Sequence, residues 1–165
     1  MKFVYILIFS LLVIGCSSDI DKLWENHQEH IDYRAKLLKT QKAIFYDQNN
    51  TAKVIITATY LQENNNTEEF IISIYTDEKI EEDFFKIYTI SLNNTPAQQI
   101  QPLSKDNKLL NNISFKTKWN RQFLVKFEHI DNDRLFIVFK DPNENEVKLY
   151  FAKKAKYLLS KSISF

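Results

Sequence analysis

The chain has 165 residues, of which 44% are hydrophobic, 14% aromatic and 26% charged, with a net charge of +1. This balance predicts a folded chain with a hydrophobic core and excludes an intrinsically disordered one. Because the chain carries no strong excess of basic residues, we expect no nucleic-acid partner. The chain has a single glycine, Gly15, so Gly-rich phosphate-binding loops of the P-loop and Rossmann types are excluded as well.

The first sixteen residues combine a positive start with an apolar run. Lys2 precedes an uncharged stretch from Phe3 to Ile14. That stretch is too short to span a membrane, which takes about 20 residues, but its length is typical of a secretory signal segment. It leads into Leu12-Val13-Ile14-Gly15-Cys16, which ends in the one cysteine of the chain.

This ending resembles the lipobox of bacterial lipoproteins. The resemblance implies that residues 1–15 are a signal peptide and that the Cys16 thiol carries diacylglycerol. Cys16 would then be the first residue of the mature protein, with 16–18 as a lipidated tether. Two or three acyl chains anchor a protein stably, whereas one binds reversibly. The alternatives are a plain secretory signal with an incidental cysteine, and a single-pass anchor.

The same resemblance bears on localisation. In many Gram-negative bacteria an aspartate directly after the lipidated cysteine retains the protein in the inner membrane. Here that position is Ser17, which favours the outer membrane. We therefore expect a protein of the cell envelope that is attached to a membrane through acyl chains on Cys16.

Residues 19–40 are predicted to form one amphipathic helix. Apolar residues and one histidine recur there at three- and four-residue spacing, which places them on one face. They are Ile20, Leu23, Trp24, His27, Ile31, Ala35 and Leu38. We expect this stripe to pack on the rest of the domain.

Residues 41–165 change to a period of two, which predicts strands bounded by turns. The expected strands carry apolar residues on alternate positions. These positions are Val54, Ile56, Ala58 and Tyr60; Phe70, Ile72 and Ile74; Phe84, Tyr88, Ile90 and Leu92; Phe123, Val125 and Phe127; Leu135, Ile137 and Phe139; and Val147, Leu149 and Phe151. The region from Thr95 to Asn112 is less regular and is expected to cross between sheets. Residues 153–160 are expected to form a short helix or a last strand.

Asparagine and aspartate are expected at the turns, because the mature chain lacks glycine and these residues tolerate positive φ best. The clusters are Asn49-Asn50, Asn64-Asn65-Asn66, Asn93-Asn94, Asn111-Asn112 and Asp131-Asn132-Asp133. Asp141-Pro142-Asn143-Glu144 is a further turn, in which proline sets φ at the second position and Asn143 takes the tight backbone.

About seven or eight strands without intervening helices predict a mainly β fold. We expect an antiparallel immunoglobulin-like β-sandwich preceded by one amphipathic helix. The chain thus resembles small immunoglobulin-like envelope lipoproteins, although the mature domain matches no particular family. The alternative is a curved half-barrel with a helix across its mouth, as in lipid-carrying lipoproteins.

Two asparagines lie in an acid-x-Asn-x-Thr pattern, which is similar to the extended sequon of the bacterial oligosaccharyltransferase. They are Asn49 in Asp47-Gln48-Asn49-Asn50-Thr51 and Asn65 in Glu63-Asn64-Asn65-Asn66-Thr67. Both are candidate N-glycosylation sites in exposed turns. Turn chemistry in an Asn-rich chain explains both patterns equally.

The histidines give little support for chemistry. His27 and His30 lie three residues apart on the expected helix and, with Glu29, are weak zinc or copper candidates. The spacing is not HExxH and no third ligand is evident, so we expect no metal. His129 and Asp131 have no serine on a nucleophile elbow to act on. We expect neither an enzyme nor a cofactor.

Trp119 and Arg121 are the candidate interaction residues, because they lie in the basic segment Lys116-Thr117-Lys118-Trp119-Asn120-Arg121 and such side chains anchor interfaces. A tryptophan that closes the sandwich core is the alternative. A strand edge that pairs with an extended partner is a second route to interaction.

Charge is unevenly spread along the chain. Residues 17–110 carry 10 Lys and Arg against 15 Asp and Glu, and residues 111–165 carry 11 against 6. Attraction between the two parts within one fold explains this distribution. The other interpretation is a basic face that meets lipid headgroups or a partner, formed by Lys153, Lys154, Lys156 and Lys161.

Together these features predict a lipid-anchored envelope protein with a non-catalytic interaction role and an unknown protein partner. The alternative is a lipoprotein that binds a lipid or small ligand in an apolar cavity. A sandwich core filled with bulky side chains would favour interaction, whereas a cavity of several hundred cubic ångströms would favour ligand carriage.

Overall fold

The computed structural model describes residues 29–64, 66–76, 84–117 and 119–153. Cys16, His27 and Asn65 lie outside the described residues. The chain divides into two units, Met1–Ala35 and Lys36–Phe165. The described residues of the first unit are helical, and the helix continues to residue 38. Ile20, Leu23, Trp24 and His27 of the expected apolar stripe, and residues 154–160, lie outside the described residues. The remaining stripe residues Ile31, Ala35 and Leu38 are exposed, so the expected packing of this stripe is not seen among the described residues.

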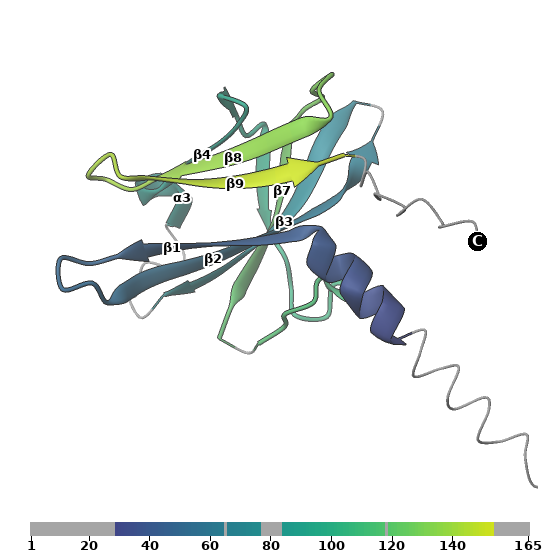
Figure 1. The fold of residues 1–165 in the computed structure, drawn as a ribbon, viewed down its shortest axis with the longest axis horizontal. Coiled ribbons are helices and arrows are strands. Elements are labelled where there is room, and N and C mark those ends of the chain that lie inside the picture. The colour runs from purple at the N-terminus through teal and green to yellow at the C-terminus, as the bar shows by residue number, and fades with distance from the viewer. Residues whose placement is uncertain (1–28, 65, 77–83, 118, 154–165) are drawn as a thin grey trace, which may run out of the picture. The chain divides into compact units, whose positions relative to one another are not determined.

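The second unit is mainly β (Figure 1). One sheet has five strands in the order β1-β2-β3-β7-β6, and the other has four in the order β5-β4-β8-β9. All neighbouring strands are antiparallel. The strands are β1 Thr40–Tyr46, β2 Ala52–Asn64, β3 Thr67–Thr76, β4 Thr89–Leu92, β5 Thr95–Pro96, β6 Gln99–Pro102, β7 Arg121–Glu128, β8 Arg134–Lys140 and β9 Glu146–Ala152.

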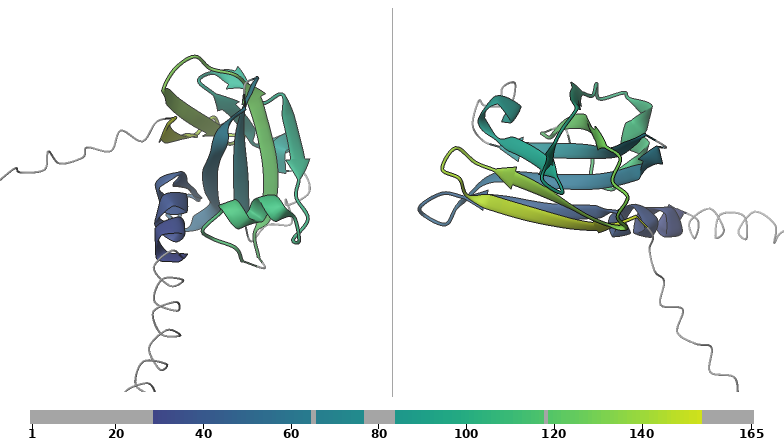
Figure 2. Two further views of the ribbon diagram at one scale, coloured as in Figure 1. Left: turned by 90° about the vertical axis from the view of Figure 1, so that its right-hand side faces the viewer. Right: turned by 90° about the horizontal axis from the view of Figure 1, so that it is seen from above.

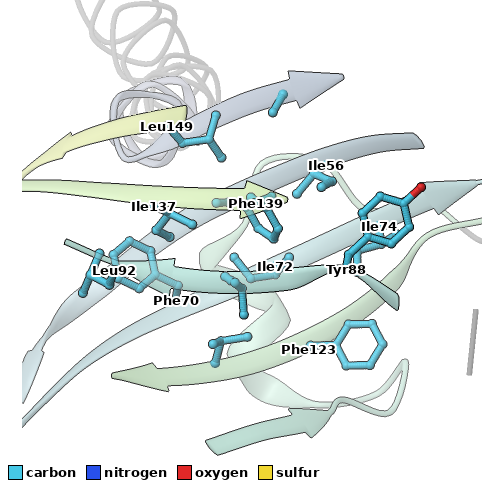
Figure 3. Close-up of a cluster of buried hydrophobic side chains, with 14 of the residues drawn as sticks. Ile56, Phe70, Ile72, Ile74, Tyr88, Leu92, Phe123, Ile137, Phe139 and Leu149 are labelled. Carbon is cyan, nitrogen blue, oxygen red and sulfur yellow. The ribbon is translucent and has the colours of Figure 1, made fainter. Parts of the chain in front are cut away.

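The core fills the space between the two sheets (Figure 3). Strands with a period of two send every second side chain inward, and the predicted apolar positions of β2, β3, β7 and β8 are all buried. Aromatic rings pack closely there: Phe70 lies edge-on to Phe127 and Phe151, with ring centroids 5.9 and 5.2 Å apart. The expected mainly β, two-sheet architecture is thereby confirmed.

The expected strand from Phe84 to Leu92 is wrong in its first half. Residues Phe84–Ile87 form the short helix α3, and β4 begins at Thr89. Tyr88 N donates to Phe84 O at 2.7 Å, and the two rings stack with centroids 4.4 Å apart. Positions four apart face the same side in a helix as well as in a strand, so the apolar spacing could not tell the two apart.

The sheet begins close to the predicted boundary at residue 41, but with a strand that the sequence analysis did not name. The helix ends at residue 38 and Thr40 already belongs to β1, where no particular strand was predicted. Tyr60 N donates to Lys39 O at 2.9 Å, so pairing with β2 draws this segment into the sheet. Lys42 lies at the outer edge of the sheet, a position where lysine discourages pairing with other chains.

The asparagine turns are confirmed in part. Asn50, Asn93 and Asn94 have positive φ angles of 60°, 47° and 71°. Asn111 and Asn112 instead end the 3₁₀ helix η1, Lys108–Asn112. In the turn after β8, Glu144 and not Asn143 takes the left-handed conformation, with a φ of 63°.

The middle of the chain crosses between sheets as predicted, since β5 belongs to the four-stranded sheet and β6 to the five-stranded one. The chain then covers the outer face of the five-stranded sheet (Figure 2). There Leu110 and Ile113 bury Ile71 in a second, smaller apolar cluster. Among the described residues no helix is long and apolar enough to cross a membrane.

Candidate functional site

The two predicted interaction residues line one surface cleft. The cleft has a volume of about 410 Å³ and lies where β6 and β7 part. We call it the Trp119 cleft. Its lining residues are Pro102, Leu103, Ser104, Lys105, Trp119, Asn120, Arg121, Gln122 and Phe123.

The pairing of β6 with β7 positions the two sides of the cleft relative to each other. Pro102 pairs with Phe123 at the end of the β6–β7 ladder, and Leu103 N still donates to Gln122 O at 2.8 Å. Beyond Leu103 the chain leaves the sheet for the loop that carries η1. The cleft is therefore built on a hydrogen-bonded ladder, which gives it a defined geometry.

Packing beneath the cleft supports it from two sides. Phe123 is buried in the main core, and Leu103 packs on the smaller cluster formed by Ile71, Leu110 and Ile113. Trp119, by contrast, is 64% exposed. This exposure rules out the alternative that Trp119 closes the sandwich core, because a core residue would be largely excluded from water.

The lining of the cleft is positively charged. Among its nine residues Lys105 and Arg121 are cationic, and none is acidic. The longer stretch 104–121, which includes that basic segment, carries five Lys or Arg and one Asp in the sequence. It also contains Phe115, which is 47% exposed. An exposed indole beside cations suits recognition of an anionic, partly apolar partner.

A second cluster of polar side chains is buried at one end of the sandwich. Glu68 is 0% exposed, and its Oε2 accepts from the hydroxyl of Tyr60 at 2.8 Å. Its Oε1 lies 2.5 Å from Lys153 Nζ, accepts from Ile130 N at 3.1 Å, and lies 3.3 Å from His129 Nδ1. We call Tyr60, Glu68, His129 and Lys153 the Glu68 cluster.

The surroundings of Glu68 keep it ionised. Burial raises the pKa of the Glu68 carboxyl, but hydrogen bonds from Lys153, Ile130 N and Tyr60 and the charge of Lys153 lower it by more, so its pKa lies below the ordinary value. Lys153 Nζ also donates to Ile130 O, and its side chain is 7% exposed. Because this carboxylate is buried and already paired with Lys153, it stabilises the fold and is not accessible to a substrate.

The Glu68 cluster bears on the two interpretations of the uneven charge distribution. Lys153 does not belong to a solvated basic face, because Glu68 pairs with it inside the protein; Lys154, Lys156 and Lys161 lie outside the described residues. The pair does fit the idea that the acidic and basic parts of the chain attract each other. Sequence reasoning missed Glu68, although its position two residues before Phe70 places it on the same inward face.

Asn49 lies exposed in the hairpin between β1 and β2. The acid of its pattern, Asp47, has a local role there, since its Oδ1 accepts from Asn49 N and Thr51 N, both at 2.8 Å. Residues 141–145 repeat the arrangement: Asp141 Oδ1 accepts from Asn143 N and Asn145 N at 2.8 Å. That turn has no Asn-x-Thr pattern, so turn chemistry alone explains Asp47, and glycosylation of Asn49 stays a prediction.

Of the two weak metal candidates the structure describes only His30, and among the described residues it is not brought together with further ligands. His30 lies exposed on the helical residues 29–38, and the description does not extend to His27. In the described ranges no group of three or more His, Cys, Asp or Glu side chains is arranged to hold a metal ion. His129 Nε2 lies 3.9 Å from Asp131 Oδ1, at the edge of ion-pair distance.

No family model matches the chain, and neither a curated protein nor a solved structure matches it.

Proposed function

We propose that this chain is a lipid-anchored protein of the cell envelope, held in the outer membrane by acyl chains on Cys16. Its sandwich has a non-catalytic role in which the Trp119 cleft binds a partner protein. The anchor is supported by the lipobox-like run Leu12-Val13-Ile14-Gly15-Cys16. The interaction role is supported by the geometry of the sandwich.

One observation carries the interaction role: Trp119, 64% exposed, and Arg121 lie in the same cleft. Large aromatic and arginine side chains dominate the binding energy of protein interfaces. The space between the sheets, in turn, is occupied by core side chains from both sheets, which favours interaction over carriage of a lipid.

The immunoglobulin-like assignment also stays a proposal. Immunoglobulin domains divide their strands as ABED and CFG. Here β1, β2 and β3 are consecutive neighbours in one sheet, which departs from that order, while the two packed antiparallel sheets agree with it. An experimental structure of the chain compared strand by strand with that order decides the assignment.

The anchor is tested by the intact mass of the protein extracted from membranes of its host. We expect the mass of a chain that begins at Cys16 plus acyl groups. A Cys16→Ser variant should lose the acyl mass and leave the membrane fraction. A wild-type chain without lipid mass would overturn the anchor.

The interaction role is tested by crosslinking in living cells. A photoreactive residue replaces Ser104, which lines the cleft, or Lys148, an exposed residue of β9. We expect one defined protein adduct from position 104 that position 148 does not give. The absence of an adduct at 104, or the same adducts at both positions, contradicts the role proposed for the cleft.

A further inference from the structure

We propose that the exposed apolar stripe of the helical residues 29–38, with the cations beside it, docks on a membrane surface of anionic phospholipid. The inference goes beyond the proposed function, because it adds a second membrane contact that needs neither the Trp119 cleft nor a partner protein. The docking residues, which we call the stripe surface, are Ile31, Arg34, Ala35, Leu38 and Lys39. Three features of the described residues support it.

The first feature is an apolar helix face that the described part of the protein leaves uncovered. Ile31, Ala35 and Leu38 follow one another at spacings of four and three residues, which places them on one face of a helix. Ile31 is 46% exposed and Leu38 66%, and Ala35 is exposed as well. Contiguous apolar surface that stays exposed marks a place where a protein meets a partner or a membrane.

The second feature is the charge around the stripe. Residues 33–46 contain four cations and no carboxylate, although the whole chain has a net charge of only +1. The four cations are Arg34, Lys36, Lys39 and Lys42. Arg34 and Lys39 are exposed, and within the described residues no ion pair joins either of them to a carboxylate. An amphipathic helix with basic residues beside its apolar face is typical of a segment that binds an anionic membrane surface.

The positions of the acidic residues agree with this orientation. Around a helix with 3.6 residues per turn, Arg34 lies about 60° from Ile31, whereas Asp32 lies about 100° and Glu29 about 160° away. The guanidinium therefore borders the stripe, and the two carboxylates lie farther from it. An anionic surface in contact with the stripe would meet the cation before either acid, which is the arrangement that favours binding.

The third feature is the short chain length between the stripe and the proposed anchor. Cys16 precedes Glu29, the first described residue, by thirteen positions. A chain of that length spans at most about 45 Å, so acyl chains on Cys16 would hold the stripe surface close to the bilayer. A surface that is already tethered to its target binds at a raised effective concentration. A soluble partner lacks this advantage, which favours the bilayer as the occupant.

The test uses the full chain reconstituted in vesicles of phosphatidylcholine, with or without phosphatidylglycerol. An environment-sensitive fluorophore is attached to a cysteine introduced by Leu38→Cys or, as the control, by Tyr150→Cys. Tyr150 is 66% exposed on β9, so its exposure matches that of Leu38. A nitroxide quencher on the lipid acyl chains reports whether each label enters the bilayer.

We expect quenching at position 38 and none at position 150, and stronger quenching when phosphatidylglycerol is present. Ile31→Ser should weaken the quenching at position 38, because it removes apolar area from the stripe surface. Quenching should also fall as salt rises from about 0.05 M to about 0.5 M, because salt screens charges at the surface.

The role of the cations is tested by two double variants that both carry the label at position 38. Arg34→Gln with Lys39→Gln removes two cations of the stripe surface. Lys108→Gln with Lys116→Gln is the matched control, which removes two exposed cations elsewhere. The first should lower the ratio of docked to undocked helix at least about tenfold, as expected when two cations near an anionic surface are lost. The control should dock as its parent does.

Three results would overturn the inference. The first is a label at position 38 that the lipid quencher does not reach, or that it quenches no more than the label at position 150. The second is docking that is equal in both lipid mixtures and in both double variants, since the surface would then not recognise anionic lipid. The third is shielding at position 38 that grows with protein concentration and needs no lipid, which would assign the stripe to a second copy of the chain.

The proposed anchor has a control of its own in the same experiment. A wild-type chain whose Cys16 is acylated takes up no fluorophore, because Cys16 is its one cysteine. Labelling of the wild type would contradict the anchor. The comparison of positions 38 and 150 in a Cys16→Ser background would still decide the inference, so the two claims fail separately.

Discussion

Lys153 Nζ lies 2.5 Å from Glu68 Oε1 and so joins the two sheets of the sandwich. Glu68 is on β3 of the five-stranded sheet, and Lys153 directly follows β9 of the four-stranded one. Lys153 N also donates to Asp133 O at 2.9 Å, which ties in the connection between β7 and β8. A charge pair that is nearly excluded from water therefore closes one end of the core.

We expect removal of one member of this pair to destabilise the fold strongly. Glu68→Gln or Lys153→Met leaves an uncompensated charge in the interior, which costs about 3–5 kcal/mol. The double variant should lose less than the sum of the two single losses, because it leaves no buried charge. The measurement is the free energy of unfolding from denaturant titration.

The neighbouring residue offers a matched control. Glu69 pairs with Lys126 at 2.8 Å, but the side chains are 18% and 29% exposed. Glu69→Gln should cost only about 0–1 kcal/mol, as more exposed ion pairs do. Equal losses for Glu68→Gln and Glu69→Gln would contradict the role assigned to the buried pair.

The lowered pKa of Glu68 predicts how stability changes with pH. Its folded-state pKa lies below its unfolded value, which is about 4.3. The unfolded state therefore binds a proton first, and stability that is present above about pH 4.3 is lost as the pH falls through the folded pKa. Unfolding measured from pH 7 to pH 3 should show this loss, and Glu68→Gln should reduce the slope. An unchanged slope would show that other carboxyls dominate.

The two matching hairpin turns predict a reciprocal pair of substitutions. Asn50 and Glu144 occupy equivalent positions, with φ angles of 60° and 63°. Asparagine tolerates this conformation better than glutamate. Glu144→Asn should therefore stabilise the fold, and Asn50→Glu should destabilise it, each by about 0.5–1 kcal/mol. Thermal unfolding of both variants checks the signs, and two shifts of the same sign would refute the equivalence.

Glycosylation is predicted only in a host that has the pathway. There, the intact mass should carry sugar increments that are lost in part in Asn49→Gln and in part in Asn65→Gln. Asn143→Gln is the control, because Asn143 occupies the position of Asn49 in the matching turn without a following threonine. Increments that persist when Asn49 and Asn65 are both replaced would place the sugar elsewhere.

The fold was predictable where one strand face is fully apolar. Phe70, Ile72 and Ile74 share one apolar face, and β3 lies where that pattern indicates, although Ile71 on the opposite face is apolar as well. The pattern failed at Phe84 and Tyr88, because a spacing of four satisfies both periods. It also failed at β1, because Ala43 and Phe45 face the core while Ile44 and Tyr46 on the opposite face are apolar or aromatic as well, so the strand shows no clear alternation.

The candidate site was predictable as a pair of residues but not as a cleft. Trp119 and Arg121 could be chosen as interaction candidates because tryptophan and arginine often anchor interfaces and because both lie in a basic segment. Lys105 and Leu103 could not be assigned to the Trp119 cleft from the sequence, because only the pairing of β6 with β7 brings them there. Glu68 looked like one acid among several in a turn, and its partner Lys153 lies more than eighty positions away.

The sequence by itself determined the β class of the domain and part of its asparagine turns, because these depend on local composition and on a period of two. Tertiary structure decided which charges meet: it buried Glu68 against Lys153 and placed Lys105 and Arg121 in the lining of one cleft. Such contacts depend on strand order and register, which are set by packing across the whole sandwich. No short window of residues contains that information.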